Sequence, residues 1–357
     1  MDIPRAIALS RFASFGPVSL LRLWKAFPNL EDVFRADAQS LERAGIGPAA
    51  AQTFLQKRAA LDPAQEDKHV RDAGISVTAL DDPTYPALLK EIPTPPLLLY
   101  HKGKLPTNSD ICVAIVGTRL ATPYGNSCAL TFARELARSG VIIVSGLAIG
   151  IDTAAHEASI EVGGRTIAVV AHGLNTLYPT QNRLLAERIV STGGAIVSEF
   201  PLGMEPMKQN FPLRNRIISG LSKATLVVEG KLTSGALITA REALDQNRDI
   251  FAVPGDITRE NSAGPNSLLQ AGASVALSPE DILNALALEA ALPLPAKAVD
   301  VPAETRVVLD ALDKNPKSID DVVHVANLSA SEVMSILTQL ELQQLARDVG
   351  GGLYVKM

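Results

Sequence analysis

The chain has 357 residues, of which 47% are hydrophobic and 20% charged, so it is long enough for two or three domains and too apolar to be disordered. The formal net charge of -5 excludes a uniformly basic nucleic-acid binder but allows a local basic groove. Cys112 and Cys128 lie in apolar segments without a CxxC partner, which indicates reduced thiols rather than a disulfide or a metal site. The chain shows no signal-peptide pattern and no apolar run of membrane-spanning length, so we expect a cytoplasmic protein that does not contact a membrane.

Residues 1–66 alternate short amphipathic stretches with small-residue turns, which predicts a small helical domain. Within LERAGIGPAAAQTFLQKR (residues 41–58), one helix ends at Gly45-Ile46-Gly47 and Pro48 begins the next. This pattern is typical of a helix-hairpin-helix or SAM-like domain, whose glycines can leave N–H groups for a phosphate. The turn itself carries no lysine or arginine, so packing or protein contacts explain it slightly better.

Residues 67–109 are rich in proline with short apolar runs between, which predicts a connector packed on the next domain. Residues 110–285 alternate short apolar runs with helical stretches. This alternation predicts a doubly wound, Rossmann-like parallel sheet with helices on both faces. The expected strands are ICVAIVG from Ile111, VIIVSG from Val141, TIAVVAHG from Thr166, AIVSEF from Ala195, ATLVVEG from Ala224 and DIFAVPG from Asp249.

The segment 286–302 is rich in alanine and proline and predicts a linker. Residues 303–357 show three helical stretches, then a strand, a glycine turn and a strand, which is the pattern of a winged-helix domain. Its third helix carries Glu332 and Glu341 but no lysine or arginine, whereas helices that read DNA present cations and amides. We therefore favour a protein-contact role for this domain.

Ligands of doubly wound sheets bind beyond the C-terminal ends of the strands, where the strand order reverses. At these positions the sequence places glycine, serine and threonine before several expected helices. Their N–H groups and hydroxyls, together with the helix N-termini, favour a negative charge, so the expected ligand is a phosphate group. This rim comprises Gly117, Thr118 and Arg119 after the first strand, Ser145 and Gly146 after the second, and Ser234 and Gly235 after the fifth.

Two common phosphate-binding motifs do not fit this rim. The sequence contains no GxxxxGK[ST] segment, and GTRLATPYG after the first strand lacks the GxGxxG spacing of a dinucleotide site. Both observations argue against ATP hydrolysis and hydride transfer, and we expect neither a cofactor nor a metal ion.

A local cationic segment follows the fourth strand. Residues 206–228, PMKQNFPLRNRIISGLSKATLVV, hold no acidic residue on an otherwise acidic chain. Cations for the DNA backbone and an aromatic ring for stacking are typical of single-strand binding. Alternatively the arginines pair with carboxylates such as Glu199, and we expect at least one of Arg214 and Arg216 to be structural. The basic, amide and aromatic residues of the segment are Lys208, Phe211, Arg214, Asn215, Arg216 and Lys223.

Seven segments together resemble the bacterial DNA-processing protein A family, DprA, also called Smf. They are collinear from about Asp82 to Ala273 and comprise VGTRLATPYG, SGLAIGIDTAAH, GLNTLYPTQNRLLAERI, SEFPLG, FPLRNRIISGLS, TSGALITAREALDQNRDIFAVPG and GPNSLLQAGA. The resemblance implies a non-enzymatic protein that binds single-stranded DNA and helps to load the RecA recombinase in natural transformation or related recombination. It also implies a homodimer formed through the Rossmann-like domain.

Carried over by residue, the family's GSR becomes Gly117-Thr118-Arg119, which keeps a hydroxyl. The family's RNRIIAGLS becomes residues 214–222, with Ser219 in place of alanine. Many members carry a third basic residue where this chain has Leu213, so one expected phosphate contact is lost.

Three further residues fit structural roles better than catalytic ones. His156 has no recognisable metal or triad partner, Asp152 suits capping in the first turn of a helix, and Glu229 suits pairing with a basic neighbour rather than acting as a general acid. The alternative function is a phosphoribohydrolase-type enzyme on the same fold, but the PGGxGT segment of those enzymes is replaced here by EGKLTSGALIT. A third hypothesis, an adaptor with an inactive core, is disfavoured by the cationic segment.

Overall fold

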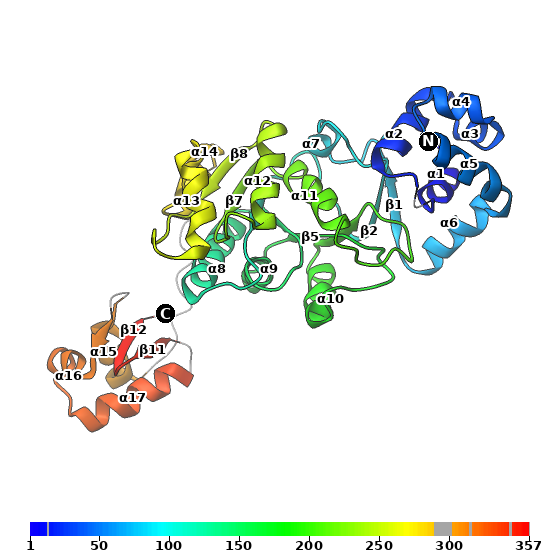
Figure 1. Ribbon diagram of the computed structural model, residues 1–357. Coiled ribbons are helices and arrows are strands. Elements are labelled where there is room, and N and C mark those ends of the chain that lie inside the picture. The colour runs from blue at the N-terminus through cyan, green and yellow to red at the C-terminus, as the bar shows by residue number, and fades with distance from the viewer. Residues whose placement is uncertain (13, 289–301, 314–315, 343–344, 357) are drawn as a thin grey trace. The chain divides into compact units, whose positions relative to one another are not determined.

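The computed structural model describes residues 1–12, 14–288, 302–313, 316–342 and 345–356, and the chain divides into two compact units, Met1–Ala291 and Leu292–Met357. The first unit contains a nine-stranded sheet in the order β1-β2-β6-β5-β4-β3-β7-β8-β9 (Figure 1). The six strands expected from the apolar runs are present and parallel, and β3 to β7 are buried throughout because helices cover both faces. Their bounds are β3 (Cys112–Val116), β4 (Ile142–Ser145), β5 (Thr166–Val170), β6 (Ala195–Ser198), β7 (Ala224–Val227) and β8 (Asp249–Ala252). The short strand β9 (Ser274–Val275) pairs with β8 in parallel.

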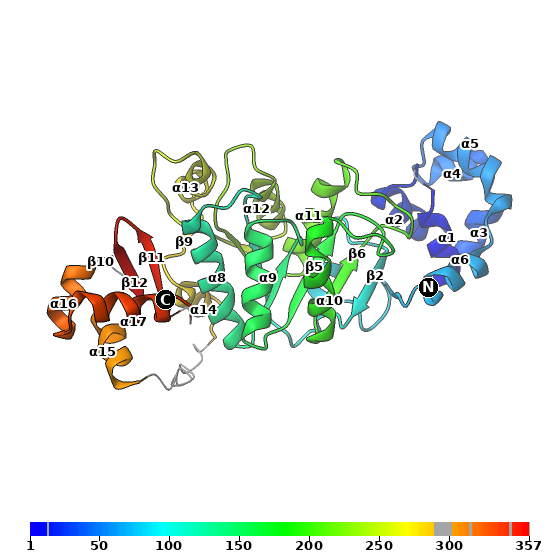
Figure 2. The same ribbon diagram turned by 90° about the horizontal axis from the view of Figure 1, so that it is seen from below.

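Helices form a layer on each side of this sheet (Figure 2). One layer holds α8, α9 and α10, and α14 contacts α8. The opposite layer holds α11, α12 and α13, and α7 contacts α11. The first set is α8 (Pro123–Arg138), α9 (Ile151–Glu161), α10 (Arg183–Ser191) and α14 (Pro279–Ala285); the second is α7 (Ala87–Lys90), α11 (Asn210–Gly220), α12 (Gly235–Asp245) and α13 (Ala263–Gln270).

The strand order reverses between β3 and β7. From β3 the chain adds β4, β5 and β6 on one side, then returns to place β7 and β8 on the other. The helices on the two sides of such a reversal diverge, which leaves a crevice at the C-terminal ends of the two strands. Gly117, Thr118 and Arg119 follow β3 directly and therefore lie at this switch point.

The N-terminal helices share a hydrophobic core with the sheet. Strands β1 (Ser76–Ala79) and β2 (Leu98–Gly103) extend the sheet antiparallel to β6, and Tyr100 of β2 bonds Ser10 of α1 at 2.8 Å between hydroxyls. Helix α6 runs across residue 66, where the sequence predicts a domain boundary, and it contacts α1. The helices are α1 (Ile3–Ser10), α2 (Pro17–Ala26), α3 (Leu30–Arg35), α4 (Ala38–Arg43), α5 (Pro48–Lys57) and α6 (Pro63–Asp72).

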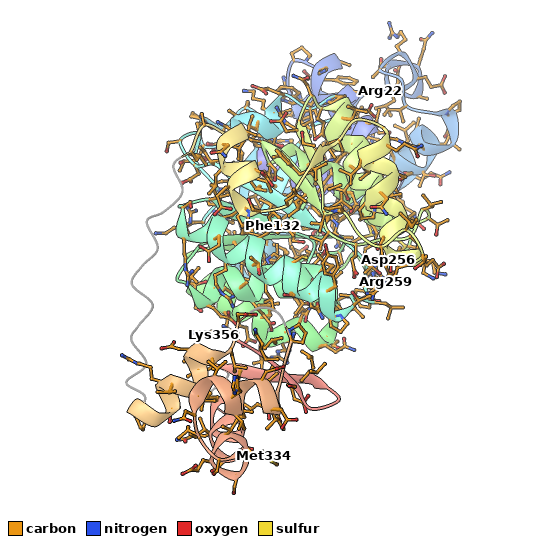
Figure 3. The ribbon with its side chains drawn as sticks, turned by 90° about the vertical axis from the view of Figure 1, so that its left-hand side faces the viewer. Arg22, Phe132, Asp256, Arg259, Met334 and Lys356 are labelled. Carbon is orange, nitrogen blue, oxygen red and sulfur yellow. The ribbon has the colours of Figure 1, made fainter. Side chains whose placement is uncertain are left out.

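The expected helical hairpin is formed by α4 and α5. Gly45 has a φ of 84°, and Gly47 precedes Pro48 at the start of α5. Arg22 of α2, which Figure 3 labels, donates from Nη1 to the carbonyl of Gly45 at 3.0 Å. A cation thus lies beside the turn although the turn contains none.

The second unit is the expected winged helix. Helices α15 to α17 pack with a three-stranded sheet in the order β10-β12-β11, in which β10 lies between α15 and α16 in the chain and β11 and β12 follow α17. Helix α17 exposes Met334 (Figure 3) but no cation. The bounds are α15 (Ala303–Ala311), β10 (Lys317–Ser318), α16 (Ile319–Ala326), α17 (Ala330–Leu342), β11 (Ala346–Gly350) and β12 (Leu353–Lys356). Of the expected linker, residues 289–301 lie outside the described part of the chain. None of the described helices has the length and apolar character of a membrane span.

Candidate nucleic-acid interface

Two adjoining cavities open at the switch point. The first, of about 270 Å³, lies between the end of β3, α11 and the start of α12, and we call it the polar cavity. The second, of about 290 Å³, lies between α11 and the loops after β4 and β5, and we call it the aromatic cavity. Arg119, Ala148 and Phe211 line both cavities and therefore mark the junction between them.

Arg119 is held at the junction by an aromatic ring. Its guanidinium carbon lies 5.1 Å from the centroid of the Phe211 ring, within the range of a cation–π contact. The side chain is exposed, and no carboxylate of the described residues lies within ion-pair distance of it. Its hydrogen-bond donors therefore remain available to a ligand in either cavity.

Glu229 anchors the loop that carries Arg119. This buried carboxylate follows β7 and accepts the Thr122 N–H at 3.0 Å and the Thr122 hydroxyl at 2.6 Å. The Glu229 carbonyl also accepts the Thr118 N–H at 2.7 Å. The loop after β3 is thus tied to the end of β7, and Glu229 pairs with the loop rather than with the basic neighbour expected from the sequence.

Gly150 lets the SGLAIGID segment approach the same loop closely. Its φ is 84°, and a Cβ at this position would lie 2.5 Å from the Thr118 carbonyl oxygen. The Ile151 N–H donates to that oxygen at 3.3 Å. The segment therefore packs against the Arg119 loop, and only a glycine fits at this contact.

The Asp152 carboxylate accepts hydrogen bonds from backbone N–H groups of the loop after β4, where the sequence predicts a phosphate. Its Oδ2 accepts from the Gly146 N–H at 3.0 Å and from the Ala148 N–H at 3.2 Å, while the Ser145 hydroxyl donates to the Ile115 carbonyl at 2.6 Å. The carboxylate thus caps the loop after β4 rather than its own helix. Burial raises the pKa of Asp152, and the nearby Arg214 opposes that shift.

Arg214 lines the floor of the polar cavity. It is 5% exposed, and its Nη1 donates to the Val169 carbonyl. Burial lowers the pKa of Arg214 to about 10, while Asp152 counteracts the shift, so the side chain stays charged at neutral pH. Its Nε has no partner among the described residues. Arg119 and Arg214 bring two positive charges to this cavity, which the Asp152 carboxyl group also lines.

The start of α12 completes the polar cavity. Ser234 caps the helix by accepting the Ala236 N–H at 3.3 Å, and Asn215 donates to the Gly235 carbonyl at 3.2 Å. The first turn of α12 carries no acidic residue, so the helix dipole adds to the positive potential. Most of the predicted rim and cationic residues therefore meet here.

Arg216, Lys208 and Ser145 do not line either cavity. Arg216 binds both carboxylate oxygens of Glu199 at 2.6 and 2.7 Å, and each of the two side chains is 7% exposed. This is the pairing that the sequence allowed for one of the two arginines. Lys208 is exposed just before α11. We therefore leave Arg216 out of the interface.

The loop after β5 supplies two residues that the sequence prediction missed. The Tyr178 ring lies 6.1 Å from the Phe211 ring at an interplanar angle of 62°. His172 is buried, and its Nε2 accepts the Tyr178 N–H at 3.3 Å. The sequence prediction rests on small and basic residues at the ends of the other strands. After β5 the available signal is an aromatic residue, Tyr178, in GLNTLYPTQN.

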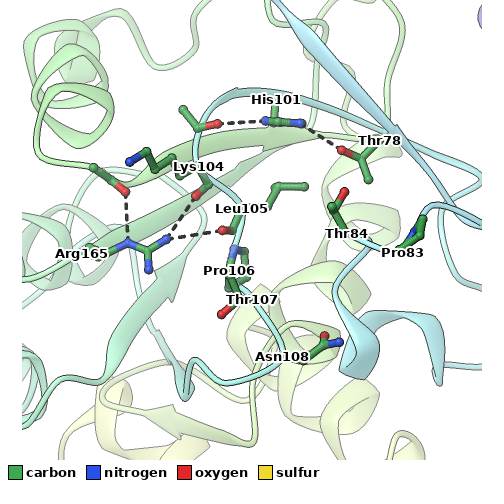
Figure 4. Close-up of a pocket in the computed structure, with 12 residues that line it drawn as sticks. Thr78, Pro83, Thr84, His101, Lys104, Leu105, Pro106, Thr107, Asn108 and Arg165 are labelled. Atoms are coloured by element: carbon green, nitrogen blue, oxygen red, sulfur yellow. Dashed lines mark hydrogen bonds between the residues drawn. The ribbon is translucent and has the colours of Figure 1, made fainter.

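A larger cavity of about 770 Å³ lies at the other ends of the strands, beside the starts of β5 and β6 (Figure 4). There Arg165 donates to the carbonyls of Gly193 at 3.1 Å and Leu105 at 3.4 Å, and His101 lies between the Thr78 hydroxyl at 3.1 Å and the Gly103 carbonyl. Because these polar groups satisfy one another, they are not aimed at a ligand.

His156 is a core residue. Its Nδ1 lies 2.7 Å from the Thr166 hydroxyl, and burial lowers its pKa to about 3, so the ring is neutral. Within the described ranges, no three His, Cys, Asp or Glu side chains are placed to hold a metal ion.

Comparison with known proteins agrees with this architecture. The family described as DNA recombination-mediator protein A matches residues 76–287, and the DprA winged helix domain matches residues 292–352. Protein Smf of Synechocystis is 36% identical over 98% of this chain and 97% of its own length. DNA processing protein DprA of Bacillus subtilis is 40% identical over 76% of this chain and 90% of its own.

Two solved structures are similar to this chain. DprA from Streptococcus pneumoniae superposes with a TM-score of 0.67 at 34% identity, covering 78% of this chain and 95% of that one. DprA from Helicobacter pylori, studied for its single-stranded DNA binding mode, gives a TM-score of 0.53 at 31% identity, covering 60% and 97%. With its sheet core, its winged helix and its relatives in agreement, the chain belongs to the DprA/Smf family of DNA processing proteins.

Proposed function

We propose that this protein binds single-stranded DNA at the switch point of its sheet. The observation that carries the proposal is Arg119, an exposed guanidinium at the junction of the polar and aromatic cavities with no ion-pair partner among the described residues. The relative from Helicobacter pylori, studied for its single-stranded DNA binding, supports the same conclusion.

The two cavities suit the two parts of a nucleotide. A phosphate in the polar cavity meets Arg119, Arg214 and the start of α12. A base in the aromatic cavity meets the rings of Phe211 and Tyr178. A paired base is stacked inside its duplex and cannot enter such a cavity, so we expect a preference for single strands.

We further propose that the protein acts without catalysis. Asp152 lines the polar cavity, but its Oδ2 already accepts from the N–H groups of Gly146 and Ala148, and Glu229 is buried and bonded to Thr122. A general acid or base would have to reach the ligand directly. Steady release of free base or inorganic phosphate from nucleotides by the pure protein would contradict this.

The recombination-mediator family supports the finer proposal that the bound strand is passed to the RecA recombinase, in transformation or in repair-related recombination. We also propose a homodimer through the Rossmann-like domain, and the surface at the β9 edge of the sheet is suited to that interface. The edge strand β9 (Ser274–Val275) is followed by Leu277, and the side chains of Val275 and Leu277 are 47% and 76% exposed. Exposed apolar edges of this kind are typical of interfaces.

Titration against single-stranded and duplex DNA at several salt concentrations tests the binding proposal. If Arg119, Arg214 and Lys208 each neutralise one phosphate, log K should fall against log salt with a slope on the order of -2. Single strands should bind more tightly at every salt concentration. Equal affinity for both forms would contradict the proposal.

Light scattering tests the homodimer. The parent should have the mass of two chains, and the double variant Val275→Asp, Leu277→Asp should have the mass of one, because two charges would be buried in the interface. A parent of single-chain mass would rule out the dimer.

A further inference from the structure

A third cavity continues from the aromatic cavity. It has a volume of about 950 Å³ and lies between α10, β2 and the loop after β5. His172 and Thr180 line both this cavity and the aromatic one, so the two share a wall. We call it the α10 groove. The three cavities therefore form a row in which the aromatic cavity lies between the polar cavity and the α10 groove.

The wall between the last two cavities is built by consecutive residues. Tyr178 lines the aromatic cavity and Leu177 lines the α10 groove. His172 holds this loop from beneath, since its two ring nitrogens bond Thr176 and Tyr178 at 3.3 Å. A buried histidine with both nitrogens engaged keeps this ridge in place.

The α10 groove has an apolar floor and cations at its rim. Leu177, Ala186, Val190 and Ile196 line it. Lys102 of β2 has no ion pair among the described residues. Arg183 pairs with Glu187 at 3.3 Å, but the two side chains are 77% and 61% exposed.

The position of Arg183 favours an external anion. It is the first residue of α10, where the helix dipole disfavours a positive charge. Its exposed pair with Glu187 stabilises the protein little. A phosphate can therefore replace that partner at low cost.

Building on the proposed function, we infer that the single strand leaves the aromatic cavity across the ridge at Leu177 and Tyr178 and enters the α10 groove. There the next nucleotides lay their bases on the apolar floor, and their phosphates face Lys102 and Arg183. The wall shared with the aromatic cavity favours this occupant over a protein segment, and so does Lys102, which has no ion-pair partner in the described part of the chain.

Matched lysine variants and DNA length test the inference. Lys102→Ala removes the lysine of the α10 groove. The control Lys104→Ala removes a lysine two positions later, which lines the cavity of Figure 4 instead. Binding of oligothymidylates from about 4 to 16 nucleotides, the range of single-strand sites, is measured at several salt concentrations. Lys102→Ala should weaken only the longer strands, about two- to fivefold, and lower their salt slope by about 0.7. Lys104→Ala should change neither.

A fluorescent reporter tests the path directly. The chain has one tryptophan, Trp24, so the double variant Trp24→Phe, Leu177→Trp places a single indole in the groove wall. Longer strands should quench it by stacking, and the shortest should not.

The outcomes separate this inference from the proposed function. If Arg119→Ala weakens all lengths but Lys102→Ala and the reporter respond to none, the strand does not use the α10 groove and the inference fails alone. If Arg119→Ala also leaves binding unchanged, the proposed function fails. A reporter that responds only to peptides would assign the groove to a protein partner instead.

Discussion

Arg119 and Arg216 show how two arginines of one crevice region acquire different roles. Arg119 stacks on Phe211 and has no carboxylate partner among the described residues, whereas Arg216 binds Glu199 through two hydrogen bonds in the interior. An exposed arginine with free donors suits a phosphate, while a buried ion pair suits packing. Substitution should therefore affect binding at one position and stability at the other.

We predict that Arg119→Ala loses roughly 1.5–3 kcal/mol of single-strand binding, the range for hydrogen bonds to charged groups. The salt slope should fall by about 0.7 because one phosphate contact is lost. Arg119→Lys should recover only part, since lysine lacks the planar fork. Salt titrations and thermal unfolding measure the two effects.

The contrasting variant is Arg216→Ala. It leaves the Glu199 carboxylate buried and unpaired, which should cost about 3–5 kcal/mol of folding stability. An Arg119→Ala protein that instead loses melting temperature and keeps the parent slope would remove Arg119 from the interface.

His156 makes stability depend on pH in a defined window. Burial lowers its pKa from 6.5 to about 3, so between these values the unfolded chain binds a proton that the folded chain does not. Its contribution is therefore present above pH 6.5 and is lost as the pH falls, by about 1.4 kcal/mol per pH unit.

The variant His156→Asn keeps a group that can bond Thr166 but does not titrate. Denaturant unfolding from pH 6.5 downward should show the stability gap between parent and variant closing at that rate. Parallel stability curves would show that the ring is already protonated in the fold.

At the scale of elements, the loop between β3 and α8 depends on contacts far away in the sequence. Thr122 caps α8 by accepting the Gly125 N–H at 3.2 Å and donates its hydroxyl to Glu229, 107 residues away. One hydroxyl thus links the start of a helix, the loop of Arg119 and the end of β7.

We predict that Thr122→Val destabilises the fold by about 1–2 kcal/mol, because the cap is lost and Glu229 keeps fewer donors. DNA binding should weaken as well, since the Arg119 loop loses an anchor. Thr122→Ser keeps the hydroxyl and should behave as the parent in both assays. A valine variant of parent stability would show that the backbone contacts suffice.

At the scale of the molecule, the two ends of the chain relate differently to the core. The N-terminal helices share a hydrophobic cluster with the sheet, so a cut at residue 67 would pass through α6 and expose Tyr100 and its neighbours. The winged helix belongs to a separate unit with its own core around Val333 and Leu337.

We predict that residues 1–288 alone keep most of the affinity for single strands, because all three cavities lie within them and α17 exposes no cation. Comparison with the full chain by fluorescence anisotropy measures this. A loss on the order of 3 kcal/mol, about two decades in affinity, would assign a DNA contact to the winged helix.

The sequence by itself determined the architecture of this protein. Short apolar runs between amphipathic stretches allow little besides a covered parallel sheet, and glycine and serine after the strands mark where a ligand meets helix starts. The local pattern also separated the winged helix, and it selected Arg119, Phe211 and Arg214, which the structure places around one cavity.

Only the tertiary structure decided which polar groups remain free. The N–H of Gly146 and the guanidinium of Arg216 fit the sequence pattern of a phosphate site, yet Asp152 and Glu199 occupy them. Tyr178 and the α10 groove come from a loop whose fold depends on the buried His172. Hydrogen-bond partners far apart in the chain are chosen by packing. For this reason composition and spacing indicate the strand ends where polar groups gather, but not which of those groups remain free.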